Sequence, residues 1–198
     1  MLPYPWGEAE AAAYAAAHGA VLARGRRQAL TEGGGPSLSP ASLVATEAGA
    51  RLVLPSPNGS MIAHALAAGG ATVVAASLRN APAVAGWLAA RAEDGPVAVL
   101  AAGERWPDGS LRPAVEDLWG AGAVVDALAD SGVTGLSPEA AQAAAAFAAV
   151  RDRVADELAR CASGRELVAA GFADDVRLAG EHAVARVVPV LGNGAFRG

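Results

Sequence analysis

Short apolar runs alternate with amphipathic stretches along this chain, and this alternation constrains the fold more than any other feature. Such runs are typical of buried strands, and they lie at Ala20–Ala23, Arg51–Leu54, Ala71–Ala76 and Val97–Ala101. Stretches with helical periodicity separate them, at Glu8–His18, Ser60–Ala68 and Ala81–Arg91. Strands that alternate with helices build a parallel sheet covered on both faces. We therefore expect a layered α/β/α fold with a mainly parallel sheet, in a single domain over residues 1–198.

The second half of the chain is expected to be mainly helical. Apolar residues at helical spacing predict a helix next to Pro113, and they are Leu111, Val115, Leu118, Gly122, Val125 and Leu128. Ser137 is the predicted N-cap of a long helix that continues to Arg160. We expect a short helix over residues 163–171 and a final edge strand over Val187–Val190.

The composition limits the kinds of site that this chain can build. Hydrophobic residues make up 53% of the chain but aromatic residues only 5%, so the core must consist of Ala, Val and Leu. The net charge of −5 argues against a general affinity for nucleic acid. Every basic residue apart from histidine is an arginine, because the chain has no lysine. An anion site would therefore use arginine and backbone N–H groups.

The cysteine content and the ends of the chain suggest where the protein works. Cys161 is the only cysteine, which excludes an intrachain disulfide framework. We see no secretory signal at the N-terminus and no apolar run long enough to span a bilayer. We expect a cytoplasmic protein that acts on a small molecule, with neither nucleic acid nor membrane as a partner, and possible homo-oligomers.

Polar loops follow three of the predicted strands. In parallel sheets, ligands bind at the carboxyl ends of the strands. Three such loops carry Ser56–Ser60, Ser77–Asn80 and Gly103–Gly109. We therefore expect their side chains to face one another in a single site.

The loop Ser56–Ser60 is a candidate anion cradle. It precedes a predicted helix, whose free N–H groups and dipole favour a bound anion. Gly59 removes side-chain bulk, and Ser56, Asn58 and Ser60 add hydrogen-bonding groups. The same residues also fit an ordinary turn with Ser60 as the helix N-cap. Arg79 and Asn80 could bind anion oxygens, or they could be a solvated capping pair.

Acidic residues gather in the loop and helix that follow the predicted strand Val97–Ala101. They are Glu104, Asp108, Glu116 and Asp117. Two adjacent acids at a strand end could hold Mg²⁺ through oxygen ligands. Acids are also favoured at helix N-termini by the helix dipole alone. His18, His64 and His182 lack metal-ligand spacing, and no Gly-x-Ser-x-Gly elbow supports a catalytic triad.

Several of these motifs together resemble the 2-phosphosulfolactate phosphatase (ComB) family. The segments that carry the resemblance are Leu54–Ser60, Ser77–Asn80, Ala102–Trp106, Glu116–Ala123, Ser163–Leu167, Asp175–Val176 and Val188–Val190. Their order and spacing fit the family over essentially the whole chain. Each motif is weak alone, and the combination is specific.

The resemblance implies a Mg²⁺-dependent phosphoric monoester hydrolase. Its substrate would be 2-phospho-3-sulfolactate or a related small anionic phosphoester, and its products the hydroxy acid and phosphate. By position, the resemblance implies that Asn58, Gly59 and Ser60 bind anion oxygens, with help from Arg79 and Asn80. We also expect Ser56 and Arg105 to bind the substrate. Glu116 and Asp117 would lie at the metal or the attacking water, and Glu104 would join them in catalysis.

One departure from the family pattern concerns the start of the chain. The family usually has a strand and a helix, with an active-site aspartate, before the region that Tyr4, Pro5 and Trp6 match. Here this region comes almost at once after Met1. We expect that the start was placed too late, and the alternative is a genuinely shortened form. A shortened form could be a non-catalytic domain that binds an anion or a protein partner, which is the second hypothesis for the function.

Overall fold

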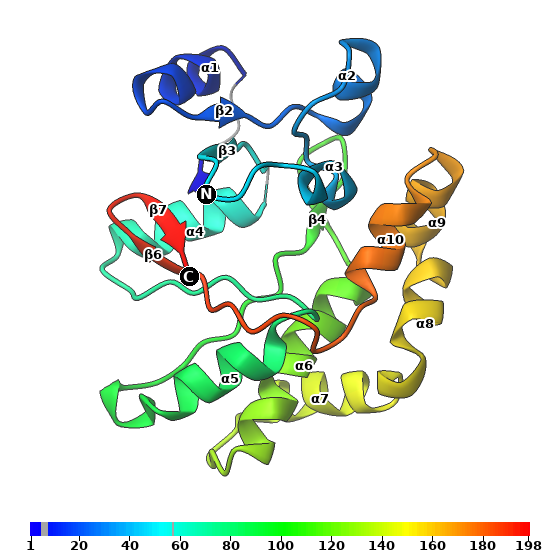
Figure 1. The fold of residues 1–198 in the computed structure, drawn as a ribbon. Helices are drawn as coiled ribbons and strands as arrows, with labels where there is room; N and C mark the ends of the chain where they lie inside the picture. The colour runs from blue at the N-terminus through cyan, green and yellow to red at the C-terminus, as the bar shows by residue number, and fades with distance from the viewer. Residues whose placement is uncertain (5–7, 57) are drawn as a thin grey trace. The chain divides into compact units, whose positions relative to one another are not determined.

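The computed structural model describes residues 1–4, 8–56 and 58–198. The chain forms two compact units. We call residues 1–74 together with 190–198 the sheet unit, and residues 75–189 the helical unit. Figure 1 traces the chain through both. The predicted single-domain organisation stays a prediction.

The sheet unit is built on three short parallel strands. They are β1 (Leu2–Pro3), β2 (Val21–Leu22) and β3 (Leu52–Leu54), in the order β1-β3-β2. Leu2 pairs with Val53 on one side of β3, and Val21 pairs with Leu52 on the other. Helix α1 (Glu8–Ala17) connects β1 to β2 and adds Ala15 to the core around Val53. These contacts confirm the predicted α/β class and its parallel sheet.

Three further helices and a hairpin complete the sheet unit. The helices are α2 (Arg26–Thr31), α3 (Pro40–Val44) and α4 (Gly59–Ala68), and the hairpin joins β6 (Val190–Gly192) to β7 (Ala195–Arg197). The predicted strand Val187–Val190 is wrong in its position, because pairing begins at Val190 and runs antiparallel to β7. Met1 exchanges backbone hydrogen bonds of 3.0 and 2.7 Å with Phe196, so β7 lies beside the residue that precedes β1.

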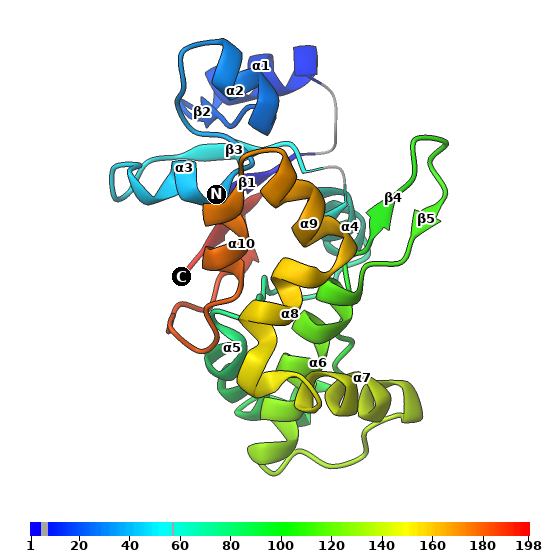
Figure 2. The same cartoon turned by 90° about the vertical axis from the view of Figure 1, so that its right-hand side faces the viewer.

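The helical unit packs around α6 (Val115–Asp130), which contacts α5 (Ala81–Ala89) and α7 (Pro138–Ala148). A Cβ at Gly122 would lie 2.1 Å from the Ala143 carbonyl oxygen, so only glycine permits this approach of α6 to α7. The unit's other elements are η1 (Ala92–Asp94), β4 (Glu104–Arg105), β5 (Leu111–Arg112), η2 (Arg151–Arg153), α8 (Val154–Arg160), α9 (Ala162–Ala169) and α10 (Ala173–Ala179). Figure 2 shows the hairpin of β4 and β5, which precedes α6 along the chain.

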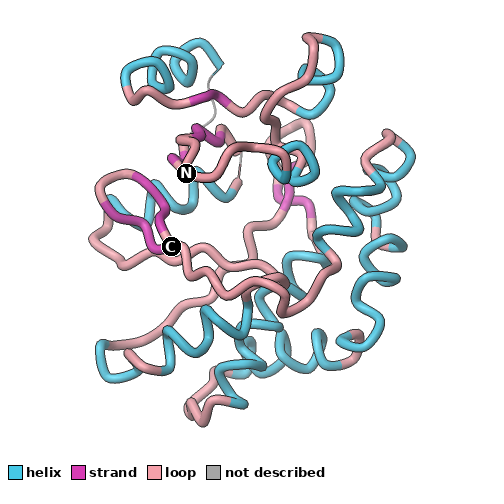
Figure 3. Tube along the Cα trace, in the orientation of Figure 1, coloured by secondary structure: helices cyan, strands magenta, loops and turns pink. Residues whose placement is uncertain are grey.

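Two of the predicted strands are wrong. Residues 97–101 form a loop (Figure 3), with Val97 46% and Leu100 54% exposed. Two of its five residues, Ala98 and Ala101, are alanines, which have a weak preference for strands. In residues 71–76, Val74 forms only an isolated antiparallel bridge with Val190.

The helical half also differs from the expectation in two places. The predicted long helix to Arg160 is interrupted, because the short 3₁₀ turn η2 separates α7 from α8. Leu111 lies in β5 and is 73% exposed, so it does not belong to the apolar face of α6. Val125 and Leu128 on that face are buried as predicted. Within the described residues, no helix is both long and apolar enough to cross a membrane.

Candidate functional site

The predicted anion cradle lies in the sheet unit, between β3 and α4. Helix α4 begins at Gly59 with Asn58 as its N-cap, so the predicted N-cap role of Ser60 is wrong. The Ser60 side chain is buried, and its hydroxyl donates a 2.7 Å hydrogen bond to the Leu54 carbonyl oxygen. Ser56 and Asn58 are half-buried, Gly59 is exposed, and Pro57 lies outside the described residues. Ser60 therefore ties the start of α4 to the end of β3.

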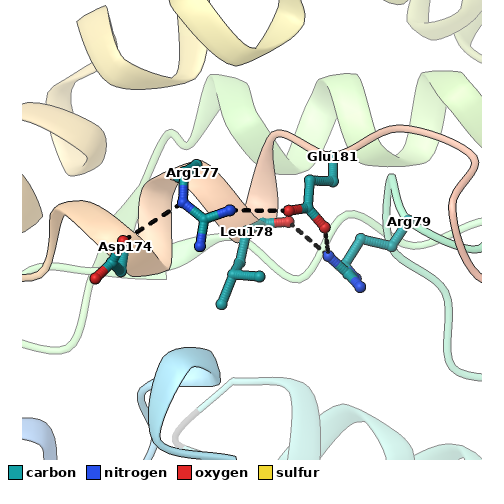
Figure 4. Close-up of polar contacts among 5 residues, drawn as sticks. All are labelled: Arg79, Asp174, Arg177, Leu178 and Glu181. Atoms are coloured by element: carbon teal, nitrogen blue, oxygen red, sulfur yellow. Dashed lines mark hydrogen bonds and ion pairs between the residues drawn. The ribbon is translucent and has the colours of Figure 1, made fainter. Parts of the chain in front are cut away.

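Arg79 belongs to the helical unit, where its guanidinium is held by the C-terminal end of α10 (Figure 4). Its Nη1 forms an ion pair with Glu181 and donates a 3.3 Å hydrogen bond to the Leu178 carbonyl oxygen. Glu181 also accepts a 3.1 Å hydrogen bond from Arg177, which in turn pairs with Asp174 at 3.4 Å. The Arg79 side chain thus joins the start of α5 to α10.

Asn80 connects the same regions from a buried position. Its Oδ1 accepts a 2.8 Å hydrogen bond from the Ser77 N–H. Its Nδ2 donates to the Ala75 and Val187 carbonyl oxygens at 3.3 and 3.1 Å. With 5% of the residue exposed, this amide is used within the fold. Arg79 and Asn80 therefore hold the segment that follows α10 against the start of α5.

The helical unit brings together three of the predicted acids. Glu104 lies in β4, and Glu116 and Asp117 lie in the first turn of α6. Burial, followed by the charges of Glu116 and Glu104, raises the pKa of Asp117 to about 6, against a hydrogen bond from the Gly103 N–H that lowers it. Gly103 has a φ of 69°, a conformation that favours glycine. The charges of Glu104 and Glu116 therefore make the electrostatic potential at the half-buried Asp117 carboxyl more negative.

The chemistry of these donors fits a hard divalent cation. Mg²⁺ is usually bound by one or two carboxylates, with waters and phosphate oxygens completing its shell. Glu116 and Asp117 can supply the two carboxylates, and a bound cation would relieve the repulsion that raises the pKa of Asp117. In the part of the chain that the structure describes, no group of three or more His, Cys, Asp or Glu residues could hold a metal by itself.

Arg105 and Asp108 shape the turn of the β4–β5 hairpin. Arg105 Nη1 donates a 2.9 Å hydrogen bond to the Gly109 carbonyl oxygen. Asp108 accepts hydrogen bonds of 2.9 and 2.6 Å from the Ser110 N–H and hydroxyl, which lower the pKa of its carboxyl. Both residues are exposed. The structure therefore shows them stabilising the hairpin that carries Glu104.

Sequence reasoning missed Arg112, which lies in β5 directly opposite Glu104. Its guanidinium binds both carboxylate oxygens of Glu166 in α9, at 2.7 and 3.0 Å. It also lies 5.0 Å from the centre of the Trp106 ring. The nearest acidic residues in the sequence, Asp108 and Glu116, each lie four positions from Arg112 and give no signal of this contact. The resemblance did single out the segment that contains Glu166.

Cys161 also lies near the acidic residues. It is the N-cap of α9, and its Sγ accepts a 3.3 Å hydrogen bond from the Gly164 N–H. Burial raises the pKa of its thiol, and Glu116 raises it further. The first turns of α6 and α9 therefore meet at Glu116.

The fold and the site define an α/β protein in which a half-buried aspartate lies near two further carboxylates, with an arginine opposite one of them. The chain belongs to the 2-phosphosulpholactate phosphatase family, whose model matches residues 4–194 of its 198 residues. This match confirms the resemblance seen in the sequence motifs. No curated protein sequence matches the chain.

Proposed function

We infer that this protein hydrolyses the phosphoester of 2-phospho-3-sulfolactate, or of a related small anionic phosphoester, with the help of Mg²⁺. Membership of the family supports a phosphatase of this substrate class. The observation that carries the proposal for this chain is the half-buried Asp117 carboxyl, placed beside Glu116 and Glu104. Carboxylates whose charges repel one another in a partly buried position are prepared to accept a cation.

The proposed reaction is direct attack by water on phosphorus. A bond forms between the water oxygen and phosphorus, and the ester bond from phosphorus to the substrate oxygen breaks. One of the three carboxylates accepts the proton that the water loses and passes it to the leaving oxygen, which becomes the hydroxyl of the product. When bound by Glu116 and Asp117, Mg²⁺ would neutralise phosphate charge.

The Ser56–Ser60 loop is the proposed anion cradle of the sheet unit. The loop precedes α4, a ten-residue helix whose first N–H groups and dipole favour a bound anion, and Gly59 at its start is exposed. Ser60 supports this loop through its bond to Leu54. We assign Arg79, Asn80 and Arg105 the same kind of supporting role, because their polar groups already bind the protein's own backbone and Glu181.

The test is release of inorganic phosphate from 2-phosphosulfolactate by the purified protein, with Mg²⁺ and with a chelator. We expect release that requires Mg²⁺ and that the variant Asp117→Asn abolishes. Asp152→Asn is the matched control, since Asp152 is an exposed aspartate of the same unit. Thermal stabilisation by the substrate without phosphate release would contradict the enzyme proposal. That result would favour the non-catalytic anion-binding domain.

A further inference from the structure

Arg112 differs from the helical unit's other site arginines in its surroundings. Only 16% of its side chain is exposed, whereas Arg105 in the same hairpin is exposed. The antiparallel register places Arg112 opposite Glu104. Glu166 raises the pKa of Arg112 most strongly, and the negative charges of Glu104 and Glu116 raise it further. Its guanidinium therefore belongs to the group of charges around Asp117.

The contact between Arg112 and Glu166 has the geometry of an arginine bound to a small anion. Nη1 and Nη2 each donate to a different carboxylate oxygen, at 3.0 and 2.7 Å. Phosphate, sulfonate and carboxylate groups bind the planar guanidinium fork in the same two-point manner. The Trp106 ring, 5.0 Å away, restricts the guanidinium further. The guanidinium of Arg112 is therefore preorganised to bind an oxyanion through two hydrogen bonds.

The two partners of this ion pair are unequal in their exposure. The Glu166 side chain is 62% exposed and the Arg112 side chain 16%. An exposed carboxylate that leaves the pair returns to water at little cost, and exposed pairs contribute only about 0–1 kcal/mol to stability. Arg112 would lose its partner in a partly buried position, where an unpaired charge is unfavourable. An incoming anion that replaces Glu166 would keep Arg112 paired, so exchange costs less than loss of Glu166 alone.

We propose that Arg112 is the anion-binding arginine of the helical unit, and that the Glu166 carboxylate occupies its fork until an oxyanion of the substrate replaces it. The inference rests on the proposed function for the identity of the substrate. Its ligand chemistry is that of a small phosphate, sulfonate or carboxylate group. Glu166 acts as an internal competitor that lowers the affinity for free anions.

Binding of inorganic phosphate, measured by isothermal titration calorimetry in the presence of Mg²⁺, tests this exchange without requiring turnover. We expect Glu166→Gln to tighten phosphate binding by roughly 3- to 10-fold, because it removes the competing charge while keeping the shape. Arg112→Lys should weaken binding by about 10-fold, because lysine lacks the planar fork. Arg153→Lys is the matched control, because Arg153 is an exposed arginine of the same unit that pairs with Glu157 at 3.1 Å, and it should bind phosphate as the wild type does.

Glu166→Gln and Arg112→Lys should change phosphate affinity in opposite directions. This result distinguishes an exchangeable ion pair from one with only a structural role. If Glu166→Gln weakens phosphate binding or leaves it unchanged, the proposal is overturned. If Arg112→Lys fails to fold, the direction of the Glu166→Gln effect decides alone. A wild type that binds no phosphate also overturns it. Phosphate release from 2-phosphosulfolactate is scored separately, so a failure of the proposed activity is distinguishable from a failure of the exchange.

Discussion

The Ser56–Ser60 loop of the sheet unit and the acidic residues of the helical unit look alike in the sequence but differ in the structure. Both regions are polar segments next to a helix start. In the loop, the buried Ser60 hydroxyl is satisfied by the Leu54 carbonyl oxygen. Among the acids, burial and the neighbouring carboxylates make the charge of Asp117 unfavourable. A hydrogen-bonded polar group stabilises the fold, whereas a carboxylate whose ionised form is disfavoured indicates a ligand-binding position.

In the helical unit, Asn80 resembles Ser60, because its polar side chain is hydrogen-bonded within the fold. Its side chain resembles a substrate-binding group in the sequence, but its hydrogen bonds go to Ala75, Ser77 and Val187. These bonds fix the return of the chain after α10. The comparison therefore predicts that the polar residues of the two kinds fail differently when they are replaced. Loss of a fold-stabilising group should lower stability, and loss of a destabilising charge should lower activity without lowering stability.

Replacement of Asp117 by asparagine should give the largest effect. We expect phosphate release to fall by roughly 10²-fold or more, because the carboxylate charge is lost from the site. At pH 7.5 the free energy of unfolding should rise by about 1–2 kcal/mol after allowance for solvent screening, because the raised pKa means that the fold disfavours the Asp117 charge.

The pH dependence of that gain has a defined sign. A folded-state pKa of about 6, above the usual 3.8, makes the penalty complete above pH 6 and relieves it as the pH falls toward 4. Denaturant unfolding of wild type and Asp117→Asn across this range measures the difference. A variant that is less stable than the wild type at pH 7.5 would show that Asp117 stabilises the fold. Asp117 and Ser60 would then both be fold-stabilising residues, against this account.

Replacement of Asn80 by alanine should produce the next largest effect, and on stability. Buried donors and acceptors left unsatisfied cost about 1–3 kcal/mol, so we expect a loss of that size from the free energy of unfolding. Arg79→Ala is the control, and its half-exposed ion pair with Glu181 should contribute about 1 kcal/mol or less. Thermal melts measure both. If Asn80→Ala keeps its stability but loses substrate affinity, Asn80 is a binding residue after all.

Replacement of Ser60 by alanine should give the smallest effect. The lost hydrogen bond to Leu54 should lower the free energy of unfolding by about 1 kcal/mol. Ser56→Ala, at a half-buried position of the same loop, should change stability by less than about 0.5 kcal/mol. Melting temperatures and the KM for substrate distinguish the roles. A large rise in KM for Ser60→Ala at unchanged stability would make its hydroxyl a direct ligand.

The sequence allowed prediction of local features more readily than of distant contacts. Helical periodicity located α1, α4 and α5, and the motif order identified the family. The run at residues 97–101 was misread because a short apolar segment has no periodicity that separates a strand from a loop.

The candidate site was likewise only partly predictable. Adjacent acids at the start of α6 are visible in the sequence, but their burial and the resulting pKa of Asp117 depend on the packing around them. The pair of Arg112 and Glu166 joins residues 54 positions apart. Neither residue carries a local signal for the other. Tertiary packing therefore determines which arginine meets the acids.

The central claim, that Asp117 and its neighbours form a cation site, is tested most directly by Mg²⁺ binding at two pH values. Isothermal titration of the wild type at pH 7.5 and pH 5 should show about 10-fold weaker binding at pH 5, because a carboxyl with a pKa of about 6 is then mostly protonated. Asp117→Asn should bind Mg²⁺ weakly at both pH values. Equal Mg²⁺ affinity of wild type and variant at pH 7.5 would contradict the account.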